Sequence, residues 1–190
     1  MAEKLAVLFP GVGYTCAKPL LYYTASAASD LGYQIERLDY GQDIHTFKGR
    51  SQEDLLPVTE LALKRILPRL GDLNIPSYKE VVFISKSIGT VIACQAEEAL
   101  GLPRPVRHFL MTPIPAALPY LNKVDGVFFS GTGDPYISSQ LILKAARDFP
   151  DKTGILFDGC DHSLEIKGDT IGNLYNIKQI VAYLTKMLEG

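Results

Sequence analysis

The sequence has no tryptophan, only three histidines and only three cysteines among its 190 residues. The cysteines, Cys16, Cys94 and Cys160, are odd in number and far apart, which suits neither a disulfide framework nor a structural zinc site. No cluster of His, Cys, Asp and Glu has the spacing of metal ligands, and no cofactor motif is complete. These absences favour a protein of a reducing, cytoplasmic compartment that uses neither a metal nor a cofactor.

Long hydrophobic runs and runs of charge are also missing. No apolar stretch reaches the roughly 20 residues that cross a membrane, and residues 1–9 have no small-residue cleavage site, so we interpret them as a strand rather than a signal peptide. The 19 basic and 21 acidic residues are dispersed and leave a formal charge of −2. Because nucleic acids and anionic membranes require a gathered basic patch, we expect neither of them as a partner, but a small-molecule substrate.

What the chain does contain is an alternation of two patterns. Short β-rich apolar runs are each followed by a longer stretch with helical spacing, which is typical of a parallel sheet covered by helices on both faces. We predict strands at residues 5–9, 34–38, 81–84, 106–111, 127–130 and 154–157. We predict helices at residues 19–31, 51–70, 88–100, 137–149 and 169–188, with a short one at 116–122.

The fold class follows from this order. With 47% hydrophobic residues, the chain is long enough for one core, so we expect one domain over residues 1–190. Its architecture is predicted as three-layer α/β/α with a mostly parallel sheet of about six strands. Ser51 with Asp54 predicts a capping box at one helix start, and Gly101 predicts a helix end. The loops at residues 41–50 and 112–119 follow strands, where ligands bind in such sheets, and are candidate pocket walls.

Residues 81–93 predict a buried strand, a tight turn and an apolar helix, with small residues two positions before and two after Ser87. A nucleophilic serine needs a sharp, strained turn, and small neighbours, here Ser85 and Gly89, let the strand and the helix approach closely. A turn that merely joins a strand to a helix gives a similar pattern. Ser85 is an alternative nucleophile, although its position would point it into the packing.

An acid and a histidine follow in later loops. Asp134 comes after the strand predicted at 127–130, and His162 comes after the strand predicted at 154–157. Both loops leave the carboxyl end of the sheet, as does the turn at Ser87, so the three side chains are expected to meet at one rim.

Other acids and histidines are less suitable. Asp161 and Glu165 flank His162, but an adjacent residue such as Asp161 has trouble reaching the imidazole of its neighbour, so Asp134 is preferred. His45 lies in a polar loop and His108 inside an apolar strand, which suit a solvated and a packed role respectively.

The strand-turn-helix at Ser87 and the chain order Ser87, Asp134, His162 resemble the α/β-hydrolase superfamily, in particular its small dienelactone-hydrolase-like and carboxylesterase-like members. The resemblance covers nearly the whole chain. It implies Ser87 as nucleophile, His162 as general base and Asp134 as the acid that orients the histidine. It also implies an acyl-enzyme intermediate and an oxyanion hole made by the backbone N–H groups of Val12 and Ile88.

The chain departs from full-length members of that superfamily. It starts at what would be their third strand, and no insertion after residues 106–111 is large enough for a cap domain. The site is therefore expected to be shallow and open, which favours a small or mid-sized carboxylic ester or thioester. Its possible walls are Tyr14, Tyr40, Met111, Pro113, Tyr120 and Tyr136.

Three other interpretations stay open with less support. Residues 5–39 imitate a dinucleotide-binding unit through Gly11 and Gly13, but Cys16 stands where the third glycine is required. A thiol enzyme based on Cys160 would place the nucleophile on the same loop as its base. A protein with the hydrolase fold that binds a ligand without turning it over is the third.

Three basic residues near the predicted site have two interpretations. Lys86, beside the nucleophile, and Lys48 and Arg50, in the polar loop, would recognise an anionic group of the substrate. Solvated surface side chains are the more usual interpretation of such residues.

Overall fold

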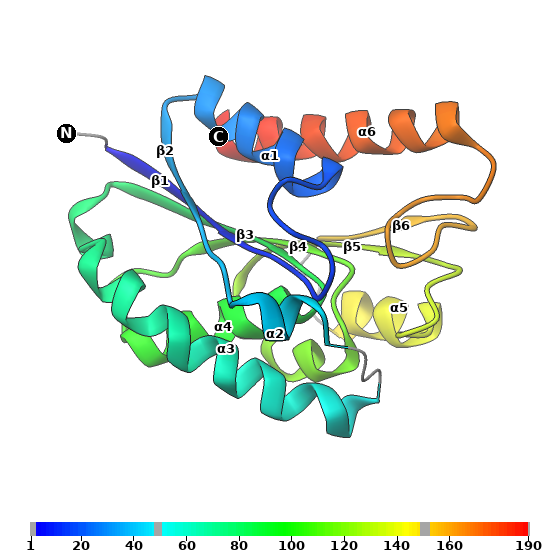
Figure 1. The fold of residues 1–190 in the computed structure, drawn as a ribbon. Coiled ribbons are helices and arrows are strands. Elements are labelled where there is room, and N and C mark those ends of the chain that lie inside the picture. Colours follow the sequence, from blue (N-terminus) through cyan, green and yellow to red (C-terminus); the bar gives the residue numbers. More distant parts are fainter. Residues whose placement is uncertain (1–2, 48–50, 149–152, 190) are drawn as a thin grey trace.

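The computed structural model describes residues 3–47, 51–148 and 153–189, and Figure 1 shows these as one three-layer unit. Its described strands form one six-stranded sheet in the order β2-β1-β3-β4-β5-β6, and every neighbouring pair is parallel. The predicted fold class is therefore confirmed. The strands are β1 (Lys4–Phe9), β2 (Tyr33–Arg37), β3 (Glu80–Lys86), β4 (Arg107–Met111), β5 (Asp125–Gly131) and β6 (Thr153–Phe157).

The helices cover the two faces of the sheet unequally. Helices α1 (Pro19–Asp30) and α6 (Thr170–Glu189) lie on one face (Figure 1). The other face carries α3 (Gln52–Asp72), α4 (Ile88–Leu100) and α5 (Ser139–Asp148), with the short α2 (Gln42–His45) beside them and the 3₁₀ helices η1 (Ile75–Ser77) and η2 (Pro115–Tyr120). None of these described helices is long and apolar enough to cross a membrane.

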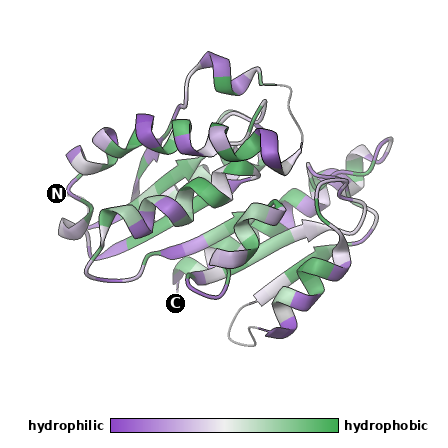
Figure 2. Cartoon of the chain, turned by 90° about the horizontal axis from the view of Figure 1, so that it is seen from below, coloured by the Kyte–Doolittle hydropathy of each residue, from purple (hydrophilic) through white to green (hydrophobic). Residues whose placement is uncertain are grey.

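Alternation along the strands builds a core on each side of the sheet. In β3, Val82 and Ile84 pack with α1 and α6, whereas Phe83 packs with α3 and α4. Successive side chains of a strand point to opposite faces, so a strand buried on both faces is hydrophobic throughout. In Figure 2 the strands are coloured mostly as hydrophobic, whereas the helices carry both hydrophobic and hydrophilic residues.

The predicted element boundaries are largely confirmed, with differences at three short helices, of which η1 lies in a segment where no element was predicted. The capping box of Ser51 and Asp54 forms at the start of α3, and Gly101 ends α4 in the left-handed conformation, with φ of 55°. Within the segment predicted as a polar loop, α2 forms one helical turn because Gly41, at φ 97°, redirects the chain. The short helix predicted at 116–122 is the 3₁₀ helix η2, which two prolines begin and nearly end.

The strand order decides where a site can form. β1 is flanked by β2 on one side and β3 on the other, so the connections leaving β1 and β3 run to opposite faces of the sheet. α1 follows β1 on one face and α4 follows β3 on the other (Figure 1). The carboxyl ends of β1 and β3 therefore flank a crevice, which is the position where open α/β sheets bind ligands.

Candidate active site

Ser87 stands at the crevice on a strained turn between β3 and α4. Its φ of 57° and ψ of −122° lie in a region that residues with a side chain rarely occupy, and its N–H donates to the carbonyl of Met111 at 3.0 Å. Gly89 makes the turn possible, because a β-carbon there would collide with the backbone oxygens of Phe9 and Pro10. The geometry matches the strand-turn-helix that the sequence predicts.

Ser85, the alternative nucleophile, points away from the crevice. Its side chain is fully buried, and its hydroxyl donates weakly to the carbonyl of Phe109 at 3.4 Å. The alternation along β3 sends Ser85 to the face opposite its neighbour Lys86. Ser85 therefore lies in the packed interior and has no access to a substrate.

The Ser87 hydroxyl, the His162 imidazole and the Asp134 carboxylate form one hydrogen-bonded line. His162 Nε2 lies 2.8 Å from Ser87 Oγ, and His162 Nδ1 lies 2.7 Å from Asp134 Oδ2. The Asp134 side chain is fully buried, whereas the His162 side chain is 18% exposed and lines a cavity together with Ser87, so the line is closed at its acid end and open at its serine and histidine end. These are the three side chains that the sequence predicts to meet at one rim of the sheet.

Close backbone contact between two loops brings the acid and the base together. The N–H of Gly133 donates to the carbonyl of Cys160 at 2.9 Å, and a β-carbon on Gly131 would collide with that same carbonyl group. Thr132 adds a side-chain link, since its hydroxyl accepts from the N–H of Gly159 at 2.7 Å. The loops that carry Asp134 and His162 are thus joined along their backbones.

Asp134 is the only carboxylate that the described structure brings to the His162 ring. The other oxygen of Asp134, Oδ1, accepts from the N–H of Tyr136 at 2.9 Å, which fixes the carboxylate. Asp161 instead accepts from the N–H groups of Ser163 and Glu165, at 2.7 and 3.2 Å, and so holds the turn of the histidine loop. The preference for Asp134 over its alternatives therefore agrees with the geometry.

The surroundings favour a neutral imidazole. Burial lowers the pKa of His162 below its usual 6.5, and the positive charge of Lys86 lowers this pKa further, while the hydrogen bond and charge of Asp134 act in the opposite direction. A neutral imidazole with its proton on Nδ1, facing Asp134, leaves Nε2 free to accept the Ser87 proton. At neutral pH the line is therefore set for proton transfer from the hydroxyl.

A cavity of about 390 Å³ opens directly beside Ser87 and His162. Apolar and polar side chains share its wall, and the polar ones come from α2 and the residue after it, the turn at Ser87, and the loops after β5 and β6. The lining residues are Val12, Gly13, His45, Thr46, Phe47, Leu55, Ser87, Ile88, Ile114, Tyr136 and His162. Both loops predicted as pocket walls contribute to the lining: the loop at 41–50 through residues 45–47, and the loop at 112–119 through Ile114.

The predicted substrate-contacting side chains are only partly correct. Tyr136 lines the cavity, and its ring centroid lies 4.5 Å from that of His162. Tyr40 and Met111 do not, because both are fully buried in the cores on either side of the sheet. Tyr14 packs against the core beside α1, where its hydroxyl accepts from the N–H of Leu20 at 3.1 Å. Pro113 and Tyr120 lie outside the lining as well.

Two of the histidine and lysine interpretations need correction. His45 is not solvated: its side chain is only 10% exposed, it lines the cavity, and its Nε2 lies 3.2 Å from Asp39 Oδ1. Lys86 is not a surface lysine, since only 1% of it is exposed. His108 is packed as predicted, with Nε2 2.8 Å from a Glu97 carboxylate oxygen. Lys48 and Arg50 lie outside the described residues.

The turn after β1 presents backbone donors to the cavity. Gly11 and Tyr14 pair across the turn, with the N–H of Gly11 donating to the carbonyl of Tyr14 at 3.0 Å. Val12 and Gly13 form the tip, and no hydrogen bond within the described part of the chain uses their N–H groups or that of Ile88. Val12 and Ile88 both line the cavity beside Ser87, where such donors can meet a developing oxyanion.

The geometry disfavours the cofactor and thiol alternatives. The turn at Gly11 and Gly13 closes on itself, and α1 begins only at Pro19, so the turn does not lead directly into a helix N-terminus that could hold a pyrophosphate. Cys160 is buried, and burial raises the pKa of its thiol. Among residues 3–47, 51–148 and 153–189, no group of three His, Cys, Asp or Glu side chains could hold a metal ion.

Comparison with known proteins adds an independent view of the fold. No protein-family model matches the sequence, and no curated protein matches it by sequence. Solved structures do match: a protein described as a hydrolase of the alpha/beta superfamily from Xanthomonas campestris pv. campestris superposes with a TM-score of 0.66 at 20% identity, over 96% of this chain and 99% of that one. The chain has the α/β-hydrolase fold.

Further structures with this α/β-hydrolase fold cover the chain almost completely. An alpha-beta serine hydrolase homologue from Coxiella burnetii has a TM-score of 0.70 at 11% identity, covering 99% of this chain and 86% of that one. Est1E from Butyrivibrio proteoclasticus, with ferulic acid bound, has a TM-score of 0.70 at 10% identity, covering 98% and 88%. The resemblance to this superfamily that the sequence suggested is confirmed at the level of the fold.

Proposed function

We propose that this α/β-hydrolase-fold protein is a serine hydrolase that cleaves a small or mid-sized carboxylic ester or thioester through an acyl-enzyme. The observation that carries the proposal is the line of hydrogen bonds from Ser87 Oγ through the His162 ring to Asp134, at 2.8 and 2.7 Å. A nucleophile, a base and an orienting acid in this order are what acyl transfer to a serine requires. The strained turn at Ser87 supports the same assignment.

The proposed reaction has two proton-transfer cycles. His162 Nε2 takes the Ser87 proton as Oγ bonds to the substrate carbonyl carbon, and the N–H groups of Val12 and Ile88 donate to the carbonyl oxygen as it becomes negative. The imidazolium then gives its proton to the leaving alcohol or thiol as the old acyl bond breaks. Water, deprotonated by the same imidazole, attacks the acyl-serine and releases the carboxylic acid and the free hydroxyl.

The cavity supports a compact, uncharged acyl group. Its volume of about 390 Å³ lies near the lower end of the usual range for small-molecule sites. Its described lining contains no lysine or arginine and includes the apolar side chains of Phe47, Leu55 and Ile114. An extended lipid chain would leave most of its length outside this cavity. The ferulic acid bound to Est1E is likewise a compact carboxylic acid.

Two measurements on the purified protein test the proposal. A fluorophosphonate probe is expected to label the wild type and not Ser87→Ala, because the probe reacts with an activated serine hydroxyl. p-Nitrophenyl acetate and butyrate are expected to be hydrolysed faster than the decanoate, and Ser87→Ala should lose this activity at least about 1,000-fold. Ser85→Ala, the matched serine control, is expected to keep both labelling and hydrolysis.

The outcomes separate catalysis from binding. Equal labelling of wild type and Ser87→Ala, or retained hydrolysis in Ser87→Ala, would remove Ser87 from the mechanism. Absence of labelling together with absence of turnover on esters and thioesters would favour the alternative of a ligand-binding protein built on a hydrolase fold.

A further inference from the structure

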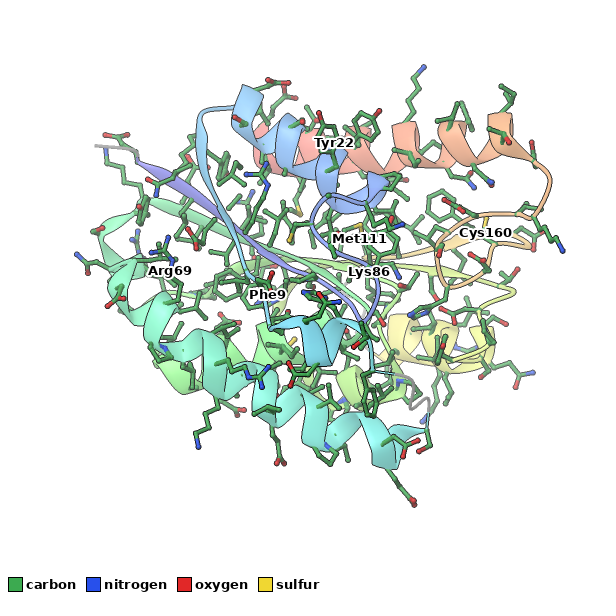
Figure 3. The ribbon with its side chains drawn as sticks, in the orientation of Figure 1. Phe9, Tyr22, Arg69, Lys86, Met111 and Cys160 are labelled. Carbon is green, nitrogen blue, oxygen red and sulfur yellow. The ribbon has the colours of Figure 1, made fainter. Side chains whose placement is uncertain are left out.

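Lys86 occupies an unusual place for a lysine, at the end of β3 and one residue before Ser87. The alternation along β3 directs its side chain to the same face as Val82 and Ile84, and only 1% of it is exposed. Figure 3 shows Lys86 in the interior, beside Met111, its partner in the register of β3 and β4. The ammonium group is therefore held inside the protein, beneath the hydrogen-bonded line at Ser87.

The ammonium group reaches three separate loops. Lys86 Nζ donates to the Thr112 hydroxyl oxygen at 2.5 Å and to the backbone carbonyl of His162 at 2.6 Å, and it lies 5.0 Å from the ring centroid of Tyr14. Tyr14 follows β1, Thr112 follows β4 and His162 follows β6. The two hydrogen bonds use two of the three N–H bonds of the ammonium, and the Tyr14 ring faces its charge. Thr112 has a φ of 45°, which is rare for a β-branched residue.

The charges around this group leave it without a direct ionic partner. Among the described residues, no carboxylate lies within ion-pair distance of Lys86, and the carboxylates whose charge acts on it are Asp134, on the loop after β5, and Asp161, on the loop after β6. Burial lowers the pKa of Lys86 to about 7, while these two carboxylates act in the opposite direction. On the acid side of neutrality, where His162 titrates, Lys86 therefore carries its proton.

We infer that Lys86 is a positioning residue for His162: its ammonium holds the backbone carbonyl of the histidine, and its positive charge disfavours a second positive charge on the imidazole. The bond fixes the loop that carries the base, so the ring keeps its place between Ser87 and Asp134. The charge keeps the base unprotonated, in the form that can accept the Ser87 proton, to a lower pH than the Asp134 partner alone would allow.

A purely structural role would predict different behaviour. A buried ammonium without a carboxylate partner is unfavourable, and a methionine would occupy a similar volume without that cost. Space filling alone therefore gives no reason for the charge to affect His162. If Lys86 acts as inferred, removing the charge changes the protonation of an imidazole to which it is joined only through the main chain.

The direct test is an NMR titration of the His162 ring in the intact protein, with its resonance assigned by its loss in His162→Asn. We expect the His162 pKa to lie below 6.5 in the wild type and to rise by about one pH unit in Lys86→Met, the size of shift that a neighbouring charge produces. Lys86→Gln, which keeps N–H donors but lacks the charge, should show a similar rise. Lys178→Met, which removes an exposed lysine on α6, should leave the pKa unchanged.

The charged and titratable groups that face this site are Asp134, Asp161, Tyr14 and Tyr136, whose ring centroid lies 4.5 Å from that of His162, with Glu165 acting on Tyr14. Asp134→Asn therefore serves as a reference of opposite sign, because loss of that carboxylate should lower the His162 pKa. An unchanged or lower His162 pKa in both Lys86 variants would overturn the inference. If neither variant folds, a wild-type His162 pKa above 6.5 would overturn it as well.

The kinetic arm rests on the proposed function. If the protein hydrolyses p-nitrophenyl acetate, the acidic limb of its kcat/KM profile should move to higher pH in Lys86→Met and Lys86→Gln by the amount found by NMR. kcat should fall more in the methionine variant, because only the glutamine keeps a donor toward the His162 carbonyl. An NMR shift without any wild-type turnover would refute the proposed function and leave the role of Lys86 standing.

Discussion

Gly89 of α4 packs directly against the carbonyl oxygen of Phe9 at the end of β1. The contact therefore joins α4 to β1, the neighbouring strand, and not to β3, the strand that precedes α4 in the chain. It brings the N-terminus of α4 next to the turn at Val12, so the two sets of backbone N–H groups face one cavity. The position of the proposed oxyanion site thus depends on the absence of one methyl group.

Gly89→Ala should therefore destabilise the protein by about 2–4 kcal/mol, because its β-carbon would overlap the backbone oxygens of Phe9 and Pro10 and force the helix away from the strand. Urea denaturation measures the change. Gly71→Ala is the matched control, since nothing lies within 4 Å of a β-carbon at that position near the end of α3, and it should be neutral or slightly stabilising. Equal effects of the two substitutions would contradict the close contact.

Asp134→Asn is expected to lower kcat on p-nitrophenyl acetate by roughly 1,000- to 10,000-fold. The amide would donate to His162 Nδ1, which places the ring proton on Nε2, and Nε2 could then no longer accept the Ser87 proton. Asp161→Asn should cost less than about tenfold, because Asp161 holds the loop and does not contact the ring. A larger loss of kcat in Asp161→Asn than in Asp134→Asn would show that Asp161, and not Asp134, orients the histidine.

The pH dependence of the proposed hydrolysis by the wild-type protein follows from the lowered pKa of His162. Protonated His162 cannot accept the Ser87 proton, so kcat/KM should be maximal above the His162 pKa and fall as the pH drops through it. The inflection is expected below 6.5, in contrast to a histidine whose pKa is governed by its carboxylate partner alone. Ester hydrolysis measured between pH 4.5 and 8 tests this; an acidic inflection above 7 would show that the charged imidazole is favoured instead.

Lys86→Met should raise stability while lowering activity. With a folded-state pKa of about 7 against 10.5 in the unfolded chain, Lys86 disfavours the folded state fully below pH 7 and progressively less as the pH rises toward 10.5. The variant lacks this cost, so its gain over the wild type should reach a few kcal/mol at pH 6.5 and shrink by pH 9. Urea denaturation at the two pH values gives the comparison, and a variant less stable than wild type at pH 6.5 would contradict it.

Local signals made the sheet, its flanking helices and the three side chains of the hydrogen-bonded line predictable. Small residues around Ser87 indicate a close approach between strand and helix. The meeting of Ser87, Asp134 and His162 can be predicted without knowing any side-chain contact, because parallel strands bring their carboxyl ends to one edge of the sheet.

The cavity wall was less accessible to such reasoning. Tyr40 and Met111 follow or end strands, as predicted, but whether a side chain there faces solvent or core depends on how the next element covers it. For Lys86 the error runs the other way. A lysine is usually exposed, and the partners that allow this one to be buried come from three loops that are distant in the sequence. The position of His45 in the wall depends on one turn of helix that begins at a glycine with positive φ.

The backbone hydrogen bond from Gly133 to Cys160 joins the loop that carries Asp134 to the loop that carries His162. If the rim of the sheet shifts when a ligand enters, Asp134 and His162 move as one body and their mutual geometry is preserved. Toward β3 the loop that carries His162 is held by the bond from Lys86 Nζ to the His162 carbonyl, so the separation between the imidazole and the Ser87 hydroxyl depends on that contact. Loosening of the Lys86 contact would then change the engagement of the nucleophile, while the bond to Asp134 keeps the tautomer of the histidine.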